Sequence, residues 1–251
     1  MRTSRSRTPP RRVDETTTDR PGEDHSPIQG LLLVDKPAGM TSHDVVQHVR
    51  RIYGERSIGH LGTLDPFATG LLVLLLGRAT RLASFLDTEP KVYEATIRFG
   101  TETDTDDETG TVIRSAAAPR ESDVRSAINS LTGKISQVPP AYSAKSVDGT
   151  RAYDAARRGT PLDMPAVDVT VHSWDVRQLS GETLSAVVTC SGGTYIRALA
   201  RDLGRLTSSA AHLGALRRRR VGEFDVRDAA TLEGLSADRV RVRPLRVIAD
   251  A

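Results

Sequence analysis

Residues 59–70 read Gly-His-Leu-Gly-Thr-Leu-Asp-Pro-Phe-Ala-Thr-Gly, and the longest aliphatic run of the chain, Leu71 to Leu76, follows directly. The stretch presents one carboxylate, Asp65, where a loop meets a strand expected in the core. Its three glycines permit close backbone approaches, and Pro66 favours an extended conformation at Asp65. An Asp-Pro pair is also an ordinary turn signal. The composition nevertheless favours a loop that holds a reactive group in a fixed position.

The segments around this loop predict an α+β fold. Apolar runs and period-two alternation predict strands at 28–34, 71–76, 91–99, 167–171, 184–190 and 216–226. Helical spacing predicts helices at 41–53, 124–131, 151–158 and 195–206, the first opened by a capping-box pattern at Thr41 and Asp44. Residues 101–111 are expected to form an acidic turn, and 137–140 a loop. Because strands and helices do not alternate strictly, we expect a mixed β-sheet core flanked by helices.

Bulk composition limits the class of protein. The 251 residues are 38% hydrophobic and 27% charged, which suits one or at most two globular domains. No apolar run approaches the roughly 20 residues that cross a bilayer. Residues 1–27 have no apolar centre, so we read them as a disordered tail. A single cysteine and no Cys and His cluster with metal-ligand spacing predict a cytoplasmic protein without a metal site.

The charge pattern suggests a polyanionic partner without establishing one. The 35 basic residues include only four lysines, so arginine dominates. Arginine binds phosphate bidentately, but arginine usage also follows genomic base composition. An acidic patch is expected at 102–108 and a basic strip at Arg217 to Arg220. Such a strip is either a solvated face or a surface that attracts nucleic acid.

Five motifs in one order resemble those of the bacterial tRNA pseudouridine-55 synthases, the TruB family. Besides the Asp65 block they are GLLLVDKP at 30–37, KVY at 91–93, QVPPAYSA at 137–144 with Gly149 and Tyr153 beyond it, and CSGGTYIR at 190–197. The similarity extends from about Gly30 to Phe224. It implies a pseudouridine synthase fold with RNA-binding loops and a catalytic domain at 28–226. It also implies cofactor-independent isomerisation of the T-loop uridine at position 55 of tRNA.

The resemblance assigns three residues to the chemistry. Asp65 corresponds to the catalytic carboxylate, which either attacks C1′ of the ribose or abstracts a ribose proton to give a glycal; the sequence leaves both routes open. Arg197 corresponds to the arginine that pairs with this carboxylate and favours its charged form. Tyr93 corresponds to the tyrosine that stacks on the target uracil and is proposed to help remove the C5 proton.

Five further residues are expected to bind the RNA. His60 corresponds to a residue that fills the gap left by the flipped base, and Tyr195 and Leu216 to positions that line the uracil pocket. Lys36 and Lys145 are candidates for phosphate contacts, with solvated lysines as the alternative. The segment 139–159 is similar to the RNA-gripping loop and helix of the family.

The chain departs from the family pattern near its end. Relatives usually carry a small RNA-binding domain of the PUA type, whereas 227–251 is expected to be a short extension that packs on the catalytic domain. We therefore expect weaker and more salt-sensitive tRNA binding. We also expect a monomer. Two other functions stay open: a related synthase that acts on another RNA, and an RNA chaperone that folds tRNA.

Overall fold

The computed structural model describes residues 28–143, 145–147, 149–160, 162–236 and 242–243, so the tail predicted at 1–27 lies outside the described part. The helices are α1 (Ser42–Tyr53), α2 (Glu121–Ser130), α3 (Ala152–Arg157) and α4 (Ile196–Leu206), with short 3-10 helices η1 (Gly77–Leu82) and η2 (Val226–Asp228). The strands are β1 (Gly30–Lys36), β2 (Ile58–His60), β3 (Thr69–Leu76), β4 (Lys91–Phe99), β5 (Thr101–Thr103), β6 (Val112–Ser115), β7 (Gly133–Gln137), β8 (Ser146–Val147), β9 (Thr150–Arg151), β10 (Val167–Leu179), β11 (Thr183–Cys190), β12 (Ala211–Val221), β13 (Phe224–Asp225) and β14 (Ala230–Thr231).

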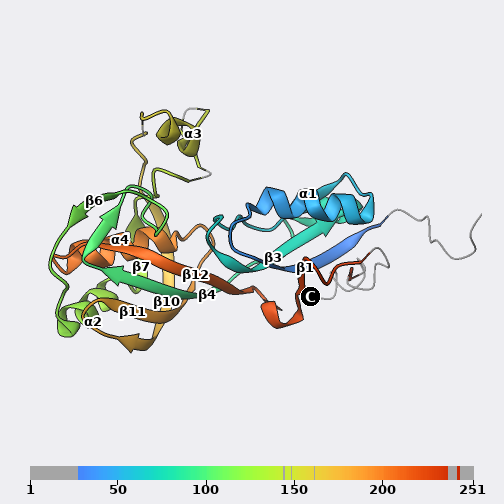
Figure 1. Ribbon diagram of the computed structural model, residues 1–251. Helices are drawn as coiled ribbons and strands as arrows, with labels where there is room; N and C mark the ends of the chain where they lie inside the picture. Colours follow the sequence, from blue (N-terminus) through green and yellow to red (C-terminus); the bar gives the residue numbers. More distant parts are fainter. Residues whose placement is uncertain (1–27, 144, 148, 161, 237–241, 244–251) are drawn as a thin grey trace, which may run out of the picture.

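One mixed sheet runs through the molecule in the order β14-β1-β3-β12-β4-β11-β10-β7, with β2 added to β3 and β13 to β12. The β3–β12 and β1–β14 pairs are parallel, and the other pairs along the order are antiparallel. Helices α2 and α4 lie with the β4–β11–β10 part of the sheet, and α1 with β1 and β3 (Figure 1). The predicted α+β class with a mixed sheet is therefore confirmed.

A narrow seam joins the two parts of this sheet. Only two residue pairs connect β3 to β12, Thr69 with Arg217 and Gly70 with Arg218. A Cβ on Gly70 would lie 2.3 Å from the carbonyl oxygen of Arg218, so the strands meet only because this residue has no side chain. The Asp65 loop leads directly into the seam, which places Asp65 between the two parts of the sheet.

Helix α1 begins as the sequence predicts. The Thr41 side chain accepts a hydrogen bond from the Asp44 backbone, and the Asp44 carboxylate accepts one from the Thr41 backbone. Val45, Val46 and Val49 are buried and pack in one hydrophobic cluster with β1 and β3. The capping box thus fixes the start of the helix, and its apolar face fixes its position on the sheet.

The main core lies under β4. Tyr93, Ala95 and Ile97 alternate inward and pack with residues of α2 and α4. Two strands at this end of the sheet differ from the predictions. Strand β7 was not predicted, and the loop expected at 137–140 begins one residue later, after β7 ends at Gln137. The last predicted strand, 216–226, instead runs from Ala211 to Val221. Both misread stretches contain glycine and small or polar residues, and their strand conformation comes from pairing with β10 and β4.

The predicted acidic patch is wrong. Glu102, Asp106 and Asp107 are buried, and arginines of α4 neutralise them. These arginines stand one helical turn apart: Arg197 lies 3.5 Å from Asp107, Arg201 2.8 Å from Asp106, and Arg205 pairs with Glu102. The acidic segment is therefore the counter-charge of one helix face.

The predicted basic strip is wrong as well. It lies on β12, where side chains alternate between two faces of the sheet. Arg218 is 1% exposed, Arg217 pairs with Asp35 at 2.7 Å, and Arg219 pairs with Glu94 at 3.0 Å. Most of the run is thus already paired or buried and does not form a free basic surface.

The described part of the C-terminal extension packs on the catalytic core. Strand β14 pairs with β1, and Leu31 exchanges two backbone hydrogen bonds with Arg243. Leu232 and Leu235 are buried in the same cluster as α1. Among the described residues, no helix is long and apolar enough to cross a membrane.

Candidate active site

Asp65 and Arg197 form a two-point ion pair although 132 residues separate them. Arg197 Nε donates to Asp65 Oδ2 and Nη2 donates to Oδ1, both at 2.9 Å. The Arg197 side chain is 6% exposed, and the Asp65 side chain is 32% exposed. The guanidinium is therefore fixed inside the protein, while the carboxylate that it orients stays accessible from outside.

The remaining donors of Arg197 are also used. Nη1 donates to the carbonyl oxygen of Thr105 at 3.0 Å, and Nη2 donates to that of Tyr142 at 2.9 Å. Asp107 adds a second carboxylate near Nη1, and its own Oδ1 accepts hydrogen bonds from Thr109. Arg197 thus joins the Asp65 loop, the acidic turn and the segment that leads to α3. Movement of any of these three segments would shift the Arg197 guanidinium and, with it, the Asp65 carboxylate.

A single buried amide fixes the start of α4. Gln137 Oε1 accepts from the Tyr195 backbone N–H at 2.8 Å, and Gln137 Nε2 donates to the Tyr195 carbonyl at 3.1 Å. Gln137 is 1% exposed. Both groups of the amide are satisfied, so Tyr195 and the helix that carries Arg197 have a defined position relative to β7.

Buried cations hold the Asp65 loop. Arg218 donates to the carbonyl oxygens of Gly62, Thr63 and Leu71 at distances of 3.0, 3.3 and 2.8 Å. Lys36 Nζ donates to the Pro66 carbonyl at 3.3 Å. The contacts lie at the start of the loop (Gly62 and Thr63), at its middle (Pro66) and just after its end (Leu71). They are the interactions that hold the loop in the fixed position expected from its sequence.

Five of the predicted site residues converge on one pocket of about 270 Å³. They are Asp65, Tyr93, Tyr195, Arg197 and Leu216. The pocket is completed by Gly62, Thr63, Leu64, Lys91, Ser143, Gly193, Thr194, Ile196 and Arg218. Its walls come from the Asp65 loop, β4, β12 and the start of α4, so segments distant in sequence build one concave site.

Tyr93 lies deep in this pocket, with 7% of its surface exposed. Burial raises the pKa of its phenol above the ordinary value, and the nearby Arg218 charge opposes this only in part. The phenol is therefore protonated at neutral pH. It offers a flat ring and an O–H group, but not a phenolate.

Lys36 does not fit the predicted phosphate contact. It is fully buried, and its ammonium donates to the carbonyls of Pro37, Met40 and Pro66. Burial lowers its pKa to about 8, with the Asp65 charge opposing the shift. With its donors used inside the protein, Lys36 supports the Asp65 loop and does not reach solvent.

His60 and Lys145 lie outside the lining of the pocket. His60 ends β2, and its buried Nδ1 has no hydrogen-bond partner within the described part of the chain. Burial and the Arg218 charge lower the pKa of His60, so the ring is neutral at pH 7. Lys145 is half-buried at the base of α3, where its carbonyl accepts from Ala152. Their RNA contacts stay predictions.

The sequence reasoning missed Arg218 and Lys91 as site residues. Arg218 stood inside a run interpreted as a surface strip, and only strand alternation separates it from its exposed neighbours. Lys91 was visible in the KVY motif, two positions before Tyr93, and a strand places such residues on one face. That spacing was the signal that could have identified it.

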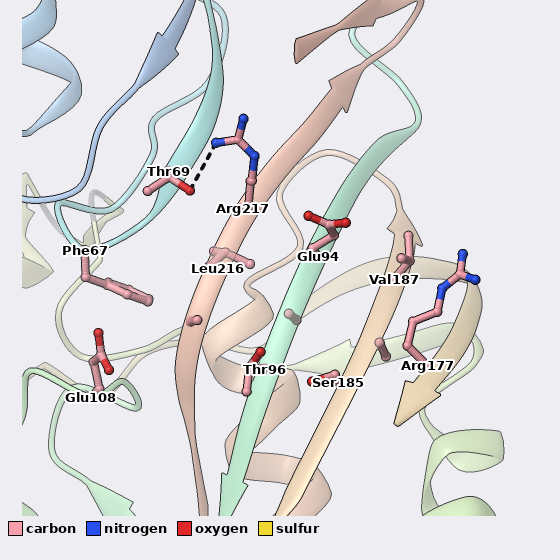
Figure 2. A pocket seen from close by; sticks show the side chains of 13 residues that line it. Phe67, Thr69, Glu94, Thr96, Glu108, Arg177, Ser185, Val187, Leu216 and Arg217 are labelled. Carbon is pink, nitrogen blue, oxygen red and sulfur yellow. Dashed lines mark hydrogen bonds between the residues drawn. The ribbon is translucent and has the colours of Figure 1, made fainter. Parts of the chain in front are cut away.

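A larger hollow, of about 390 Å³, lies elsewhere on the sheet. Figure 2 shows its wall of outward side chains from β4, β11 and β12, among them Glu94, Thr96 and Val187. Leu216 also lines it, but no other predicted site residue does. Its cations are paired, Arg177 with Asp175 and Arg217 with Asp35. The smaller pocket around Asp65 is therefore the candidate active site.

The mixed sheet and the pocket with its arginine-bound carboxylate define the class of pseudouridine synthases. Residues 50–196 match the model of the TruB family pseudouridylate synthase, N-terminal domain. The chain belongs to the TruB family.

Curated relatives agree with this assignment. The chain is 49% identical to the tRNA pseudouridine synthase B of Arthrobacter sp. (strain FB24), over 84% of its own length and 72% of the relative's. It is 50% identical to the protein of the same name from Thermobifida fusca (strain YX), over 83% of its length and 75% of the relative's. The family assignment therefore rests on most of both chains.

Solved structures share the fold at lower identity. A chain from the crystal structure of a Cbf5-Nop10-Gar1 complex superimposes with a TM-score of 0.63 and 28% identity. The match covers 81% of this chain and 52% of that one. A structure of an H/ACA RNP bound to a substrate RNA containing 2′-deoxyuridine gives a TM-score of 0.59 at 26% identity, over 51% of that chain. This chain thus spans about half the length of those chains.

Proposed function

We propose that this protein converts the T-loop uridine at position 55 of tRNA into pseudouridine. The name of the curated relatives supports tRNA as the substrate. The observation that carries the proposal is the two-point Asp65–Arg197 pair at the pocket that also contains Tyr93.

The reaction needs few groups. The N1–C1′ bond breaks, the uracil turns within the pocket, and C5 bonds to C1′. The C5 proton then leaves, and N1 ends protonated. Atoms and oxidation state balance without a co-reactant, so a placed carboxylate, a proton relay and a closed pocket suffice.

Asp65 is the proposed catalytic carboxylate. As a nucleophile it would bond to C1′, and as a base it would remove a ribose proton to give a glycal. Both routes need the ionised and oriented carboxylate that Arg197 provides through two charge-assisted hydrogen bonds. The partly exposed face of Asp65 is the face that the ribose would approach.

Tyr93 is the proposed stacking partner of the uracil and a relay for the C5 proton. Its ring lies in the pocket lining, and base stacking on an aromatic ring contributes about 1–3 kcal/mol. Because the phenol is protonated, it would accept the C5 proton only as it gives up its own. We therefore assign it to a relay rather than to a free base.

The target uridine must leave its stack before it reaches Asp65, at a cost of a few kcal/mol. We assign Tyr195 and Leu216 to the walls around the uracil, because both line the pocket. We assign neutral His60 to the gap in the RNA, and Lys145 with the segment around α3 to the phosphates. Figure 1 shows α3 standing apart from the sheet, as a gripping segment requires.

We also propose that 28–226 is the catalytic unit and that it works as a cytoplasmic monomer. The residues proposed for the chemistry, Asp65, Tyr93 and Arg197, already lie together in the pocket of a single chain. Gel filtration alone and with tRNA tests the oligomeric state, and a dimer in the active fractions would contradict it.

Mapping of the product tests the substrate. A tRNA transcript incubated with the protein should gain pseudouridine at position 55 alone, and a transcript with cytidine there should gain none. Modification of a different RNA in place of tRNA would identify a related synthase with another substrate. Binding and refolding of tRNA without any product would identify a chaperone.

A further inference from the structure

Among the described residues that line the pocket, Lys91 is the cation whose donors have no partner. It lines the pocket from β4, two residues before Tyr93, and is half-buried. Arg197 and Arg218 donate to a carboxylate and to carbonyl groups. Within the described residues, Lys91 Nζ has neither a hydrogen bond nor an ion pair. The pocket therefore contains an ammonium group ready for an external acceptor.

Two glycines keep this ammonium uncovered. A Cβ built on Gly62 would lie 3.2 Å from Lys91 Nζ, and one on Gly192 would lie 3.7 Å from it. Gly62 belongs to the Asp65 loop and Gly192 to the turn before α4. Lys91 Nζ thus lies between the two segments that carry Asp65 and Arg197, where side chains would otherwise cover it.

Without bound RNA, the lining of the pocket carries more positive than negative charge. Burial lowers the pKa of Lys91, and the neighbouring Arg218 charge lowers it further. The Glu89 charge opposes these shifts, but Glu89 Oε1 already accepts a hydrogen bond from the Gly192 backbone. The carboxylate of the pocket lining, Asp65, is bound to Arg197. An anion beside Lys91 would offset the cost of the buried charge and would form charge-assisted hydrogen bonds.

We propose that Lys91 binds a backbone phosphate of the flipped uridine nucleotide. This inference rests on the proposed function. Two strand residues span roughly 7 Å, so Lys91 lies about that far along β4 from Tyr93, the proposed stacking partner of the base. Tyr93 is nearly buried and Lys91 only half so, which puts the ammonium nearer the mouth. Flipping rotates the base inward about the backbone and leaves the phosphates at the mouth.

Charge removal at Lys91 tests this contact. Lys91→Met should weaken binding of a T-arm RNA about five- to tenfold and reduce the slope of log K against log salt by about 0.7–0.9. The value of kcat/KM should fall about tenfold, mainly through KM, and Lys91→Arg should restore most of it. Lys134→Met, at an exposed position of β7, is the matched lysine control and should change neither quantity. An unchanged slope with Lys91→Met would overturn the proposal.

Phosphate neutralisation in the RNA tests it from the other side. Methylphosphonates placed singly around position 55 should reveal one phosphate whose loss weakens the wild type as much as Lys91→Met does. The Lys91→Met protein should bind this RNA as tightly as it binds the unmodified RNA. Equal losses for both proteins at every position would overturn the proposal, and Lys91→Gln, which also removes the charge, gives the same comparison if the methionine variant does not fold.

The phosphate contact of Lys91 and the pseudouridine synthase activity can be tested separately. Product formation by the wild type with no phosphate effect at Lys91 would contradict only the contact. A phosphate effect at Lys91 without any pseudouridine in tRNA would contradict the proposed function and leave the contact standing.

Discussion

At the scale of single residues, the site is a carboxylate held at two points and left open on its other side. Arg197 is almost fully buried, and all three of its nitrogens donate. The charge of Arg197 alone does not explain such an arrangement, because a lysine would supply the same charge. Its planar fork is what sets the direction of the Asp65 oxygens.

Arg197→Lys should therefore keep the charge and lose the orientation. We expect the single-turnover rate to fall at least about 100-fold, with tRNA affinity within about threefold of the wild type. Tritium release from C5-labelled uridine measures the rate, and filter binding measures the affinity. Arg205→Lys, two turns along α4 and half-exposed, is the control and should react normally. A nearly normal rate for Arg197→Lys would contradict the orienting role.

Lys36 should make stability depend on pH. Its pKa is about 8 in the folded protein and 10.5 without the fold, so the unfolded chain binds more protons between these values. The free energy of unfolding must then rise with pH in this window. Urea denaturation at pH 7.5 to 10.5 gives the unfolding free energy of the wild type and of Lys36→Met. In the difference between the two proteins, the contributions of the other titrating groups cancel. A pH-independent difference would show that Lys36 titrates normally.

At the scale of elements, the sequence predicted what local patterns determine. The capping box at Thr41 and the alternation in β4 are confirmed. Strand β7 and the first half of β12 were missed, because their strand conformation depends on partners far away in the sequence. The acidic patch at 102–108 was misread for the same reason. Its counter-charges lie on α4, about 95 residues later, although arginines at 197, 201 and 205 already stood at helical spacing.

Gly70→Ala tests the seam between β3 and β12. The new methyl group would lie 2.3 Å from a backbone oxygen, and φ is +102°. Gly54 also has a positive φ, +65°, but nothing within 4 Å, so Gly54→Ala carries only the backbone strain of about 1–2 kcal/mol. Urea denaturation should show that Gly70→Ala loses about 1–3 kcal/mol more unfolding free energy than Gly54→Ala does. Equal losses of unfolding free energy would mean that β3 and β12 can move apart at Gly70 without an energetic cost.

At the scale of the whole molecule, the site lies where two parts of one sheet meet. The pocket draws its walls from the Asp65 loop, which precedes β3, and from β12, β4 and α4. The pairing of Asp65 with Arg197, expected from a family resemblance, is present. The sequence could not show which cationic side chains already donate their hydrogen bonds to groups inside the protein. Lys36 is satisfied inside the protein and Lys91 is not, a difference that only the packed structure reveals.

The C-terminal extension should contribute to the stability of this assembly. Leu232 is 6% exposed in the cluster under α1, so Leu232→Ala should cost about 2–5 kcal/mol of unfolding free energy. Leu206→Ala is the control, because Leu206 is 56% exposed and should cost less than about 0.5 kcal/mol. Urea denaturation of both variants measures the difference. Similar values would show that the extension is not part of the core.

We propose that the Asp65 carboxylate performs the chemistry on a uridine taken out of tRNA. Single-turnover tritium release from C5-labelled tRNA by Asp65→Asn tests this role, with tRNA binding measured in parallel. We predict a rate at least about 10⁴-fold below the wild type and an affinity within a few fold, because the amide keeps the shape and removes the reacting charge. Tritium release by Asp65→Asn at the wild-type rate would show that the Asp65 carboxylate does not perform the reaction.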